Sequence, residues 1–479
     1  MSDTTASEQG WLLDGTRRTQ AEPTLGLVLA WSLVDPGRVG QLALLPSGHG
    51  RSVLGRGEVL PDDPGTRLFF GQHRPGTPVS GDALRGSGLS RVQLVFETTR
   101  EGLRVQSVGR APLFVNDRRV GGATLSVGDV LHVERLLLLL VVSRKRGELS
   151  LRCDPPTFPF GGADPFGLVG ESPRVWSLRD ELDFLSRRSG HALLFGPSGA
   201  GKELCARSMH GLSSRARGPF VARNAATLPP GLIDAELFGS ARNYPHAGLP
   251  ARAGLLGEAE GGTLFLDEIA ELPEDLQAHL LRVLDDGEYH RLGDEKTRRA
   301  DVRFVGATNR EPSALKHDLL ARFTVRVQVP GLGERREDIP LLVRALLERH
   351  AKRDEPIRAR FFEGDHPRID PLLMSALLSA DYRAHVRELD ALLVASMATS
   401  KGPYLALSPA VQQLRRPAST PAVAALSAPN APTLPVSRAE IEQALRQTDG
   451  NVSQAFRALG LSSRDTLRRL MKKYGIDRA

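Results

Sequence analysis

Two short stretches constrain this chain more than any other feature of its sequence. The stretch GPSGAGKE runs from Gly196 to Glu203, and further along the chain the apolar run GGTLFLDE ends in Asp267 and Glu268. A glycine-rich loop before a helix turns successive backbone N–H groups toward phosphate oxygens, and the lysine at its end reaches the terminal phosphates. Carboxylates that end a buried strand suit Mg²⁺ binding and water activation. Together the two stretches predict an ATPase.

The residues of these stretches have distinct predicted roles. Lys202 is expected to bind the terminal phosphates, Asp267 to hold Mg²⁺ directly or through water, and Glu268 to polarise the attacking water. Glu203 departs from the general pattern, in which a Ser or Thr hydroxyl binds Mg²⁺. Either stretch alone could be a glycine-rich turn or an exposed strand end, but both together favour ATP and Mg²⁺ as cofactors. The predicted cradle consists of Gly196, Pro197, Ser198, Gly199, Ala200, Gly201, Lys202 and Glu203.

Length and composition indicate a multidomain intracellular protein. A chain of 479 residues is too long for one hydrophobic core, so two or three domains are expected. Cys153 and Cys205 lack metal-site spacing, which fits a reducing compartment and a structural role for both. The longest apolar run, 136–142, is far shorter than the ~20 residues of a membrane helix, and no export signal begins the chain. We therefore expect a cytoplasmic protein without membrane contact; the net charge of +7 leaves nucleic acid open as a partner.

Composition shifts divide the chain into five predicted parts. Short apolar runs between Gly, Pro and Asp predict an all-β sandwich over 25–145, and the Pro- and Gly-rich stretch 146–167 is expected to be a linker. Alternating strand-like and helical runs predict a parallel α/β domain with a helical lid over 168–401, the lid beginning at about 334. An Ala-, Pro-, Ser- and Thr-rich tether is expected over 402–436, before a helical domain over 437–479.

The C-terminal part has the form of a helix-turn-helix with a basic second helix. Its segments GNVSQAFRALG and TLRRLMKKYGI resemble the Fis-type DNA-binding family over the whole part, in which the helix matching 437–447 dimerises. DNA is therefore an expected partner, although a solvated helical hairpin remains the alternative. The residues expected to face bases or phosphates are Arg464, Thr466, Arg468, Arg469 and Lys472.

The central part resembles the AAA+ domain of bacterial enhancer-binding proteins, the activators of sigma-54 RNA polymerase. The resemblance rests on GLVGESPRVWSLRDEL, GPSGAGKE, FVARNAATLPPGLIDAELFG, GGTLFLDEIAELP and VGATN. Glu after the loop lysine is characteristic of that family, so Glu203 agrees with it. The resemblance implies that Asn224 switches Glu268 with nucleotide state, that Thr308 and Asn309 sense the γ-phosphate, and that Arg387 is the lid arginine that binds nucleotide.

The resemblance also implies a homo-oligomer, from a dimer to a hexameric ring, in which arginines act on a neighbour's ATP. In the corresponding stretch, KHDLLARF, Arg322 is kept and Lys316 replaces the first arginine. Lysine lacks the planar fork of arginine, so hydrolysis could be slowed. The surface loop that grips sigma-54 carries Gly-Ala-Phe-Thr-Gly-Ala in the family. Here the aligned residues are Asn243, Tyr244, Pro245, His246, Ala247 and Gly248, which leaves either a rewired contact surface or a solvated loop.

The N-terminal part resembles a forkhead-associated domain, a reader of phosphothreonine. Arg56, Ser90 and Arg91 occupy the positions that would bind phosphate, by charge-assisted hydrogen bonds and a hydroxyl. Gln93 replaces the usual histidine, and 111–113 replaces the usual Asn-Gly-Thr turn. A phosphothreonine-containing protein is thus an expected partner, and a sandwich used only for other protein contacts is the alternative.

Three functions follow from this order of parts. The first is a regulator of the enhancer-binding type that couples ATP hydrolysis in a ring to remodelling of an RNA polymerase holoenzyme. The second is a DNA-binding repressor or modulator of another holoenzyme, whose ATPase serves assembly only. The third is a phosphopeptide-binding scaffold with a vestigial ATPase.

Overall fold

The computed structural model describes most of the chain from residue 23 to residue 414 and part of its C-terminal region. The described residues are 23–46, 48, 50–58, 64–76, 81–99, 102–145, 149, 151–153, 157–229, 231–414, 438–448 and nine single positions between 452 and 476. Compactness divides the chain into two units, Met1–Ala422 and Val423–Ala479, and each is described by itself. None of the helices in these residues is both long enough and apolar enough to cross a membrane.

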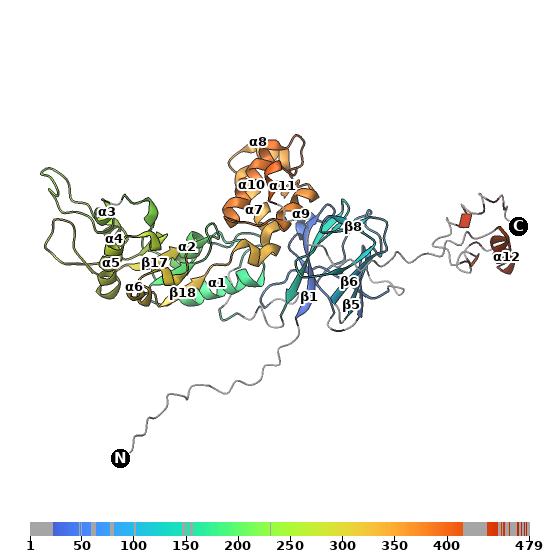
Figure 1. The fold of residues 1–479 in the computed structure, drawn as a ribbon, viewed down its shortest axis with the longest axis horizontal. Helices are drawn as coiled ribbons and strands as arrows, with labels where there is room; N and C mark the ends of the chain where they lie inside the picture. The colour runs from blue at the N-terminus through green and yellow to red at the C-terminus, as the bar shows by residue number, and fades with distance from the viewer. Residues whose placement is uncertain are drawn as a thin grey trace, which may run out of the picture. The chain divides into compact units, whose positions relative to one another are not determined.

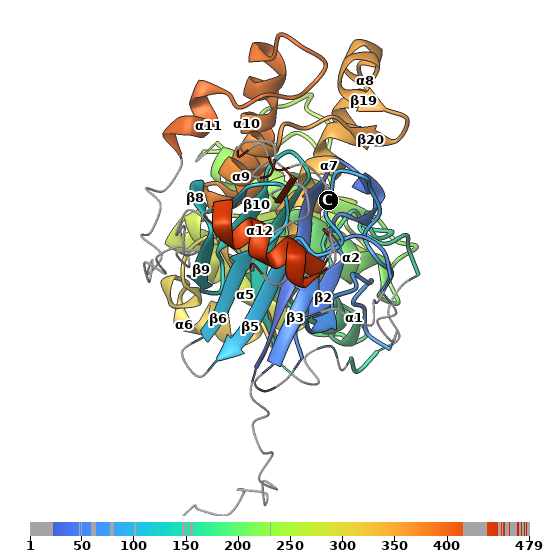
Figure 2. The ribbon, with the colours of Figure 1, turned by 90° about the vertical axis from the view of Figure 1, so that its right-hand side faces the viewer.

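The N-terminal part consists of two β-sheets that share one apolar core. The six-stranded sheet is antiparallel and has the order β2-β1-β11-β10-β7-β8, and the five-stranded sheet has the order β4-β3-β5-β6-β9. In Figure 2, β3, β5 and β6 of the second sheet run side by side. The strands are β1 (Thr24–Ser32), β2 (Leu42–Leu44), β3 (Gly50–Leu54), β4 (Thr66–Arg67), β5 (Leu94–Thr99), β6 (Gly102–Ser107), β7 (Leu113–Val115), β8 (Arg118–Val120), β9 (Gly122–Leu125), β10 (Val130–Val133) and β11 (Leu137–Arg144).

The strands β1 and β11 are buried on both faces. Their sequences, TLGLVLAWS and LLLLVVSR, are continuous apolar runs rather than alternating ones, a pattern typical of strands covered on both sides. Residues of one parity, such as Leu27 and Leu139, pack into the core between the two sheets. Residues of the other parity, such as Val28 and Leu140, pack with residues beyond position 330. The six-stranded sheet therefore has a second apolar surface that another part of the chain covers.

The central part is a parallel five-stranded sheet with helices around it (Figure 1). The strand order is β13-β14-β17-β12-β18, and all neighbours pair in parallel. Parallel strands bring their carboxyl ends to one edge, where ligands bind in open α/β sheets. The strands are β12 (Ala192–Phe195), β13 (Phe220–Asn224), β14 (Thr263–Asp267), β17 (Arg303–Thr308) and β18 (Val325–Gln328), and the helices are α1 (Pro173–Ser186), α2 (Lys202–Gly211), α3 (Ile233–Phe238), α4 (Gly254–Glu258), α5 (Glu274–Asp286) and α6 (His317–Arg322). The short strands β15 (Glu288–Tyr289) and β16 (Arg298–Arg299) form a separate hairpin.

A helical lid follows, and it is longer than the sequence predicts. Residues 402–414 belong to it and not to the expected tether, because Leu405 pairs with Ile369 and Val411 is fully buried in the lid core. The sequence-based prediction assigned these residues to the tether because a Pro-rich stretch directly follows them. The elements of the lid are η5 (Leu332–Asp338), α7 (Ile339–Ala351), α8 (Glu355–Phe361), β19 (Phe362–Glu363), β20 (His366–Pro367), α9 (Pro371–Ser379), α10 (His385–Thr399) and α11 (Pro409–Gln413).

The expected linker over 146–167 is also wrong in part, since its second half is packed. Phe158 is buried and stacks on Trp176 with 5.7 Å between ring centroids. The guanidinium groups of Arg74 and Arg179 lie 4.5 and 4.7 Å from the Phe158 ring centroid. Pro and Gly disfavour regular elements but do not prevent the aromatic residues between them from being buried. This segment fastens the N-terminal part to the α/β domain.

The C-terminal unit contains helix α12 (Arg438–Gln447) and a small apolar cluster. Ile441, Ala444 and Leu467 are buried in that cluster. Arg468 is exposed. Arg464, Thr466, Arg469 and Lys472 lie outside the described residues, so their predicted DNA contacts stay predictions.

Candidate nucleotide-binding site

The glycine-rich loop connects β12 to α2 in a conformation that side chains disfavour. Gly196, Gly199 and Gly201 have φ values of 150°, 76° and 107°, in the region that only glycine adopts easily. A Cβ atom on Gly199 would lie 2.1 Å from the carbonyl oxygen of Ala384 in the lid. The Nζ of Lys202 donates to the carbonyl oxygens of Gly196 and Pro197, at 2.9 and 3.3 Å. Burial lowers the pKa of Lys202, and the charges of Glu268 and Asp267 oppose that shift.

The two carboxylates lie at the carboxyl end of β14, beside the loop. Asp267 ends the strand, and its Oδ1 accepts the backbone N–H of Glu268 at 3.0 Å. Glu268 has a positive φ of 54°, and its Oε2 accepts the backbone N–H of Asn309 at 3.3 Å. Register pairs Asn224 of β13 with Asp267, so two adjacent strand ends contribute to one edge. Asn224 Oδ1 accepts the backbone N–H of Ala226 at 2.9 Å.

Thr308 and Asn309 end the next strand, β17. Thr308 is fully buried, its carbonyl oxygen accepts the backbone N–H of Gly196 at 3.2 Å, and its Oγ1 accepts the N–H of Arg310. Asn309 is exposed and meets Glu268 through its backbone only. Thr308 therefore anchors the loop to the sheet, while Asn309 holds the carboxylate of Glu268.

Two lid side chains contact the loop, those of Arg387 and Arg335, and the sequence predicted the first. Arg387 of α10 lies with its Nη1 3.5 Å from Ser198 Oγ, as expected for a lid arginine over the loop. Arg335 of η5 is only 4% exposed and donates from Nη2 to the carbonyl oxygen of Ala200 at 2.8 Å, while its Nε has no partner among the described residues. His385, with a φ of 48°, joins two segments of the lid, because its Nδ1 accepts the backbone N–H of Leu332 at 3.0 Å. The next residue, Val386, donates its backbone N–H to the carbonyl oxygen of Gly199 in the loop at 3.1 Å. Arg335 lies in the run GERRED and His385 in YRAHVREL, but no local sequence pattern indicated a role for either residue.

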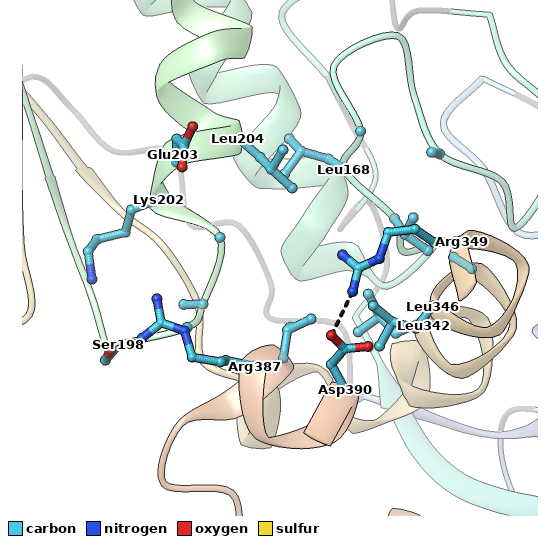
Figure 3. Close-up of a pocket in the computed structure, with 18 of the residues that line it drawn as sticks. Leu168, Ser198, Lys202, Glu203, Leu204, Leu342, Leu346, Arg349, Arg387 and Asp390 are labelled. Carbon is cyan, nitrogen blue, oxygen red and sulfur yellow. Dashed lines mark hydrogen bonds and ion pairs between the residues drawn. The ribbon is translucent and has the colours of Figure 1, made fainter. Parts of the chain in front are cut away.

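A cavity of about 660 Å³ lies between the α/β domain and the lid (Figure 3), and its lining includes Lys202, Glu268 and Arg335 but not Thr308, Asn309 or His385. One end is polar and contains Ser198, Lys202 and Arg387, with Asp267, Glu268 and Asn224 in the same lining. The other end is apolar and lies between Leu168, Leu204, Leu342 and Leu346. The ion pair of Arg349 Nη2 with Asp390 Oδ2, 2.6 Å apart, lies at this apolar end. A cavity with a cationic end and an apolar end suits a ligand with an anionic group and a flat ring.

Lys316 and Arg322 do not belong to this cavity. Lys316 lies 3.1 Å from Glu274 through its Nζ, and Arg322 forms an ion pair with Asp285. Both side chains are partly exposed, 40% and 45% respectively. Neither side chain lines the cavity of its own chain in this arrangement.

The loop 243–248 is exposed and folded by its own contacts. Asn243 has a φ of 69°, and its Oδ1 accepts the backbone N–H of Gly248 at 2.9 Å. Tyr244 packs against Gly293 and stays 40% exposed. An aromatic side chain is thus displayed on this surface.

Arg56, Ser90 and Arg91 lie on two adjacent loops of the N-terminal part. The backbone N–H of Arg56 donates to the carbonyl oxygen of Ser90 at 3.1 Å, and Arg56 and Arg91 are exposed. Gln93 is fully buried, donates from Nε2 to the carbonyl oxygen of Ala111 at 2.8 Å, and accepts the N–H of Ser90 at 3.4 Å. Gln93 thus fixes the Ser90 loop against the neighbouring loop.

We expect ATP affinity to fall in acid because of His385. Burial lowers the pKa of His385, and the charge of Arg335 adds to this while Glu388 opposes it. Only the neutral ring accepts from Leu332, so this contact holds above the ordinary histidine pKa of about 6.5 and is lost as pH falls through the lowered value. Titration of a fluorescent ATP analogue between about pH 7.5 and 5 measures the effect. His385→Asn keeps an acceptor and tolerates positive φ, so its affinity should lose this pH dependence; identical acid profiles would assign the effect to another group.

Comparison with known families agrees with this geometry. Residues 168–328 match the sigma-54 interaction domain, 333–425 the AAA+ ATPase lid domain, and 435–474 the bacterial regulatory proteins of the Fis family. The transcriptional regulatory protein ZraR of Salmonella typhimurium is 34% identical over 321 residues, which cover 66% of this chain and 70% of that protein. XylR of Pseudomonas putida is 45% identical over 191 residues, 38% of this chain and 34% of that protein.

A solved structure of a related protein covers a similar share. NtrX of Brucella abortus in complex with ATP is 32% identical, covers 64% of this chain and 69% of its own, and has a TM-score of 0.45. The three family matches occur in the order expected from the sequence, and ZraR is matched over more than two thirds of its length. The chain therefore belongs to the sigma-54-dependent transcriptional regulators, with an ATPase domain and a Fis-type DNA-binding domain.

Proposed function

We propose that this protein binds and hydrolyses ATP in the cavity between the α/β domain and the lid, and uses the cycle to remodel a DNA-bound RNA polymerase. The observation that carries the proposal is that one cavity joins Lys202, the carboxylates of Asp267 and Glu268, and Arg387 of the lid. The buried, unpartnered Nε of Arg335 and the lysine bonded only to carbonyl oxygens fit an anionic ligand.

Each polar residue of the cavity has a separate proposed role in ATP binding or hydrolysis. Bound ATP with Mg²⁺ supplies the phosphoanhydride bond that is cleaved. Lys202 would exchange its carbonyl partners for phosphate oxygens, and the loop N–H groups and the N-terminus of α2 would hold the same anion. Asp267 would hold the metal, and Glu268 would take the proton of the attacking water. Glu203, at the start of α2, lines the same cavity and pairs with Arg207. Arg387 would neutralise phosphate charge when the lid closes.

Assembly into a ring is the part of the proposal that Lys316 and Arg322 support. Lys316 directly precedes helix α6 and pairs with Glu274. Arg322 ends α6 and pairs with Asp285. An arginine that reaches a neighbour's γ-phosphate stabilises the charge of the transition state. We propose that Arg322 exchanges Asp285 for the neighbour's nucleotide, with Lys316 as an accessory cation.

The partner of the ring is expected to be the sigma-54 holoenzyme. The sequence of the loop 243–248 favours a second candidate, another holoenzyme. Tyr244 supplies an exposed aromatic group in place of the usual phenylalanine, whereas the threonine of the pattern has no counterpart. A regulator of another holoenzyme, using its ATPase for assembly, is therefore the alternative.

Promoter opening decides between the two partners. With ATP, we expect open complexes with sigma-54 polymerase and not with the housekeeping polymerase, and loss of opening when 243–248 are replaced by alanines. Permanganate footprinting measures the open strands. Opening that is unaffected by the loop replacement, or that occurs only with the housekeeping enzyme, would favour the alternative.

Two binding functions complete the proposal. The C-terminal unit would dimerise through α12 and place Arg464, Thr466, Arg468, Arg469 and Lys472 against DNA. The N-terminal domain would read phosphothreonine through Arg56, Ser90 and Arg91, because Gln93 supplies hydrogen bonds that hold the Ser90 loop in place. A phosphothreonine peptide is the ligand with which to test it.

A further inference from the structure

The N-terminal domain covers the lid with an apolar face. Val28, Ala30 and Leu140 on the outer face of β1 and β11 belong to the same buried cluster as Leu341 and Leu377 of the lid. In Figure 1, α9 of the lid lies beside the β-strands of the N-terminal domain. Continuous apolar contact of this kind is typical of permanent interfaces and not of tethered domains.

Trp31 closes this interface with a directional contact. Its indole is 8% exposed, and Nε1 donates to the carbonyl oxygen of Ile369 at 2.9 Å. The two residues are 338 positions apart in sequence. Asp117 adds a second contact of this type, since its Oδ1 accepts the hydroxyl of Ser375 at 3.1 Å. The interface therefore has a defined register between β1 and the lid.

Two arginines of the N-terminal domain hold the two segments at which the lid joins the α/β domain. Arg144, at the end of β11, pairs with Glu337 of η5; the side chains are 9% and 12% exposed. Arg74 donates from Nε to Glu171 Oε2 at 2.9 Å, in the segment that precedes α1. These pairs are nearly dry, so removing either partner leaves an uncompensated charge.

The same two segments are joined to each other at Asp338. Its Oδ1 accepts the backbone N–H groups of Glu171 and Ser172 at 2.7 and 2.9 Å, and its Oδ2 accepts the Ser172 hydroxyl at 2.5 Å. Asp338 is 1% exposed. The buried carboxylate of Asp338 therefore links the segment before α1 to η5. An arginine of the N-terminal domain pairs with a residue of each segment, Arg74 with Glu171 and Arg144 with Glu337.

This junction also forms walls of the nucleotide cavity. Leu168 and Val169, just before Glu171, line its apolar end. Arg335, three residues before Asp338, lines the cavity and bonds the loop at Ala200. A shift of either segment therefore changes the shape of the cavity.

We propose that the N-terminal β domain is a clamp on the junction at Asp338, which holds the lid in its ATP-binding position through Arg74, Arg144 and Trp31. The inference rests on the proposed binding of ATP. It assigns the N-terminal domain a role in forming the nucleotide site, whatever ligand the domain itself binds. Loosening the clamp removes preorganisation of the cavity and weakens ATP binding.

Charge reversal in the full-length protein tests the clamp. The variants are Arg144→Glu, Glu337→Arg and the double exchange, with Arg51→Glu as matched control, since the Arg51–Glu97 pair lies within the five-stranded sheet and is 61% and 47% exposed. Hydrogen exchange without nucleotide should be faster over 167–172 and 332–338 in each single variant, and return toward wild type in the double exchange. Affinity for a fluorescent ATP analogue should fall about fivefold or more in the singles and recover in the double.

Trp31→Phe gives a milder opening, because it keeps an aromatic side chain and removes the N–H that Ile369 accepts together with part of the buried indole. If the charge-reversal variants do not fold, this variant tests the clamp in their place. We expect faster hydrogen exchange over the same two segments. Exchange like that of Arg51→Glu in every foldable variant would overturn the clamp, as would faster exchange with unchanged affinity. Wild-type protein that binds no analogue would instead overturn the proposed ATP binding, while the exchange measured without nucleotide still judges the mechanical clamp.

Discussion

Glu268→Gln is expected to reduce ATP hydrolysis about 10²–10⁴-fold while ATP binding is kept. The amide has the shape of the carboxylate and still offers an oxygen to the backbone N–H of Asn309, which Glu268 Oε2 accepts at 3.3 Å. It cannot take a proton from water. Phosphate release measures turnover, and a fluorescent ATP analogue measures binding.

A control for this variant lies within the same short segment. Glu271→Gln alters a carboxylate that pairs with Arg310 at 2.5 Å and lies outside the cavity lining. We expect near wild-type turnover from it. Equal background rates in wild type, Glu268→Gln and Glu271→Gln would support the scaffold with a vestigial ATPase instead.

Arg322→Ala is expected to reduce turnover about 10³-fold without weakening ATP binding, if Arg322 completes a neighbour's site. Within its own chain the guanidinium pairs with Asp285 and lies outside the cavity, so its loss leaves local nucleotide contacts intact. Asp285→Ala is the control, because it removes the same ion pair and keeps the arginine. Its turnover should stay close to wild type.

Mixing the two inactive proteins gives the sharpest form of this test. A subunit with Arg322→Ala retains Glu268, and a neighbour with Glu268→Gln retains Arg322, so some mixed interfaces contain both groups. We expect phosphate release to rise on mixing and to depend on protein concentration. No recovery at concentrations that support wild-type turnover would place the action of Arg322 within its own chain.

The site could be predicted from the sequence where its residues are neighbours along the chain. The loop 196–203 and the pair Asp267 and Glu268 each carry their chemistry in a few consecutive letters, and parallel pairing brings their strand ends to one edge. Arg335, His385, Arg349 and Asp390 carried no such signal. Each acquires its role from a contact with a distant segment, such as Arg335 with Ala200 or Arg349 with Asp390.

The domain boundaries, too, could be predicted only where they depend on local sequence and not on contacts with distant segments. The linker expected over 146–167 was read from its Pro and Gly residues, but the aromatic ring of Phe158 is buried against Trp176 and two arginines. Residues 402–414, expected to belong to a tether, are part of the lid, because Leu405 and Val411 are buried in the lid core. Composition reports what a backbone prefers, and burial depends on which surface is available to cover it.

The sequence by itself determined that this chain has a phosphate-binding loop, a pair of strand-end carboxylates, a lid and a DNA-binding segment, because each depends on local backbone geometry or on a short periodic pattern. Only the tertiary structure decided that β1 and β11 cover the lid, that Arg144 and Arg74 meet its junction with the α/β domain, and that Gln93 holds the Ser90 loop. These contacts join residues far apart in the chain. Their free energy comes from removing apolar surface from water while each buried charge keeps a partner, and no local run of letters specifies that combination.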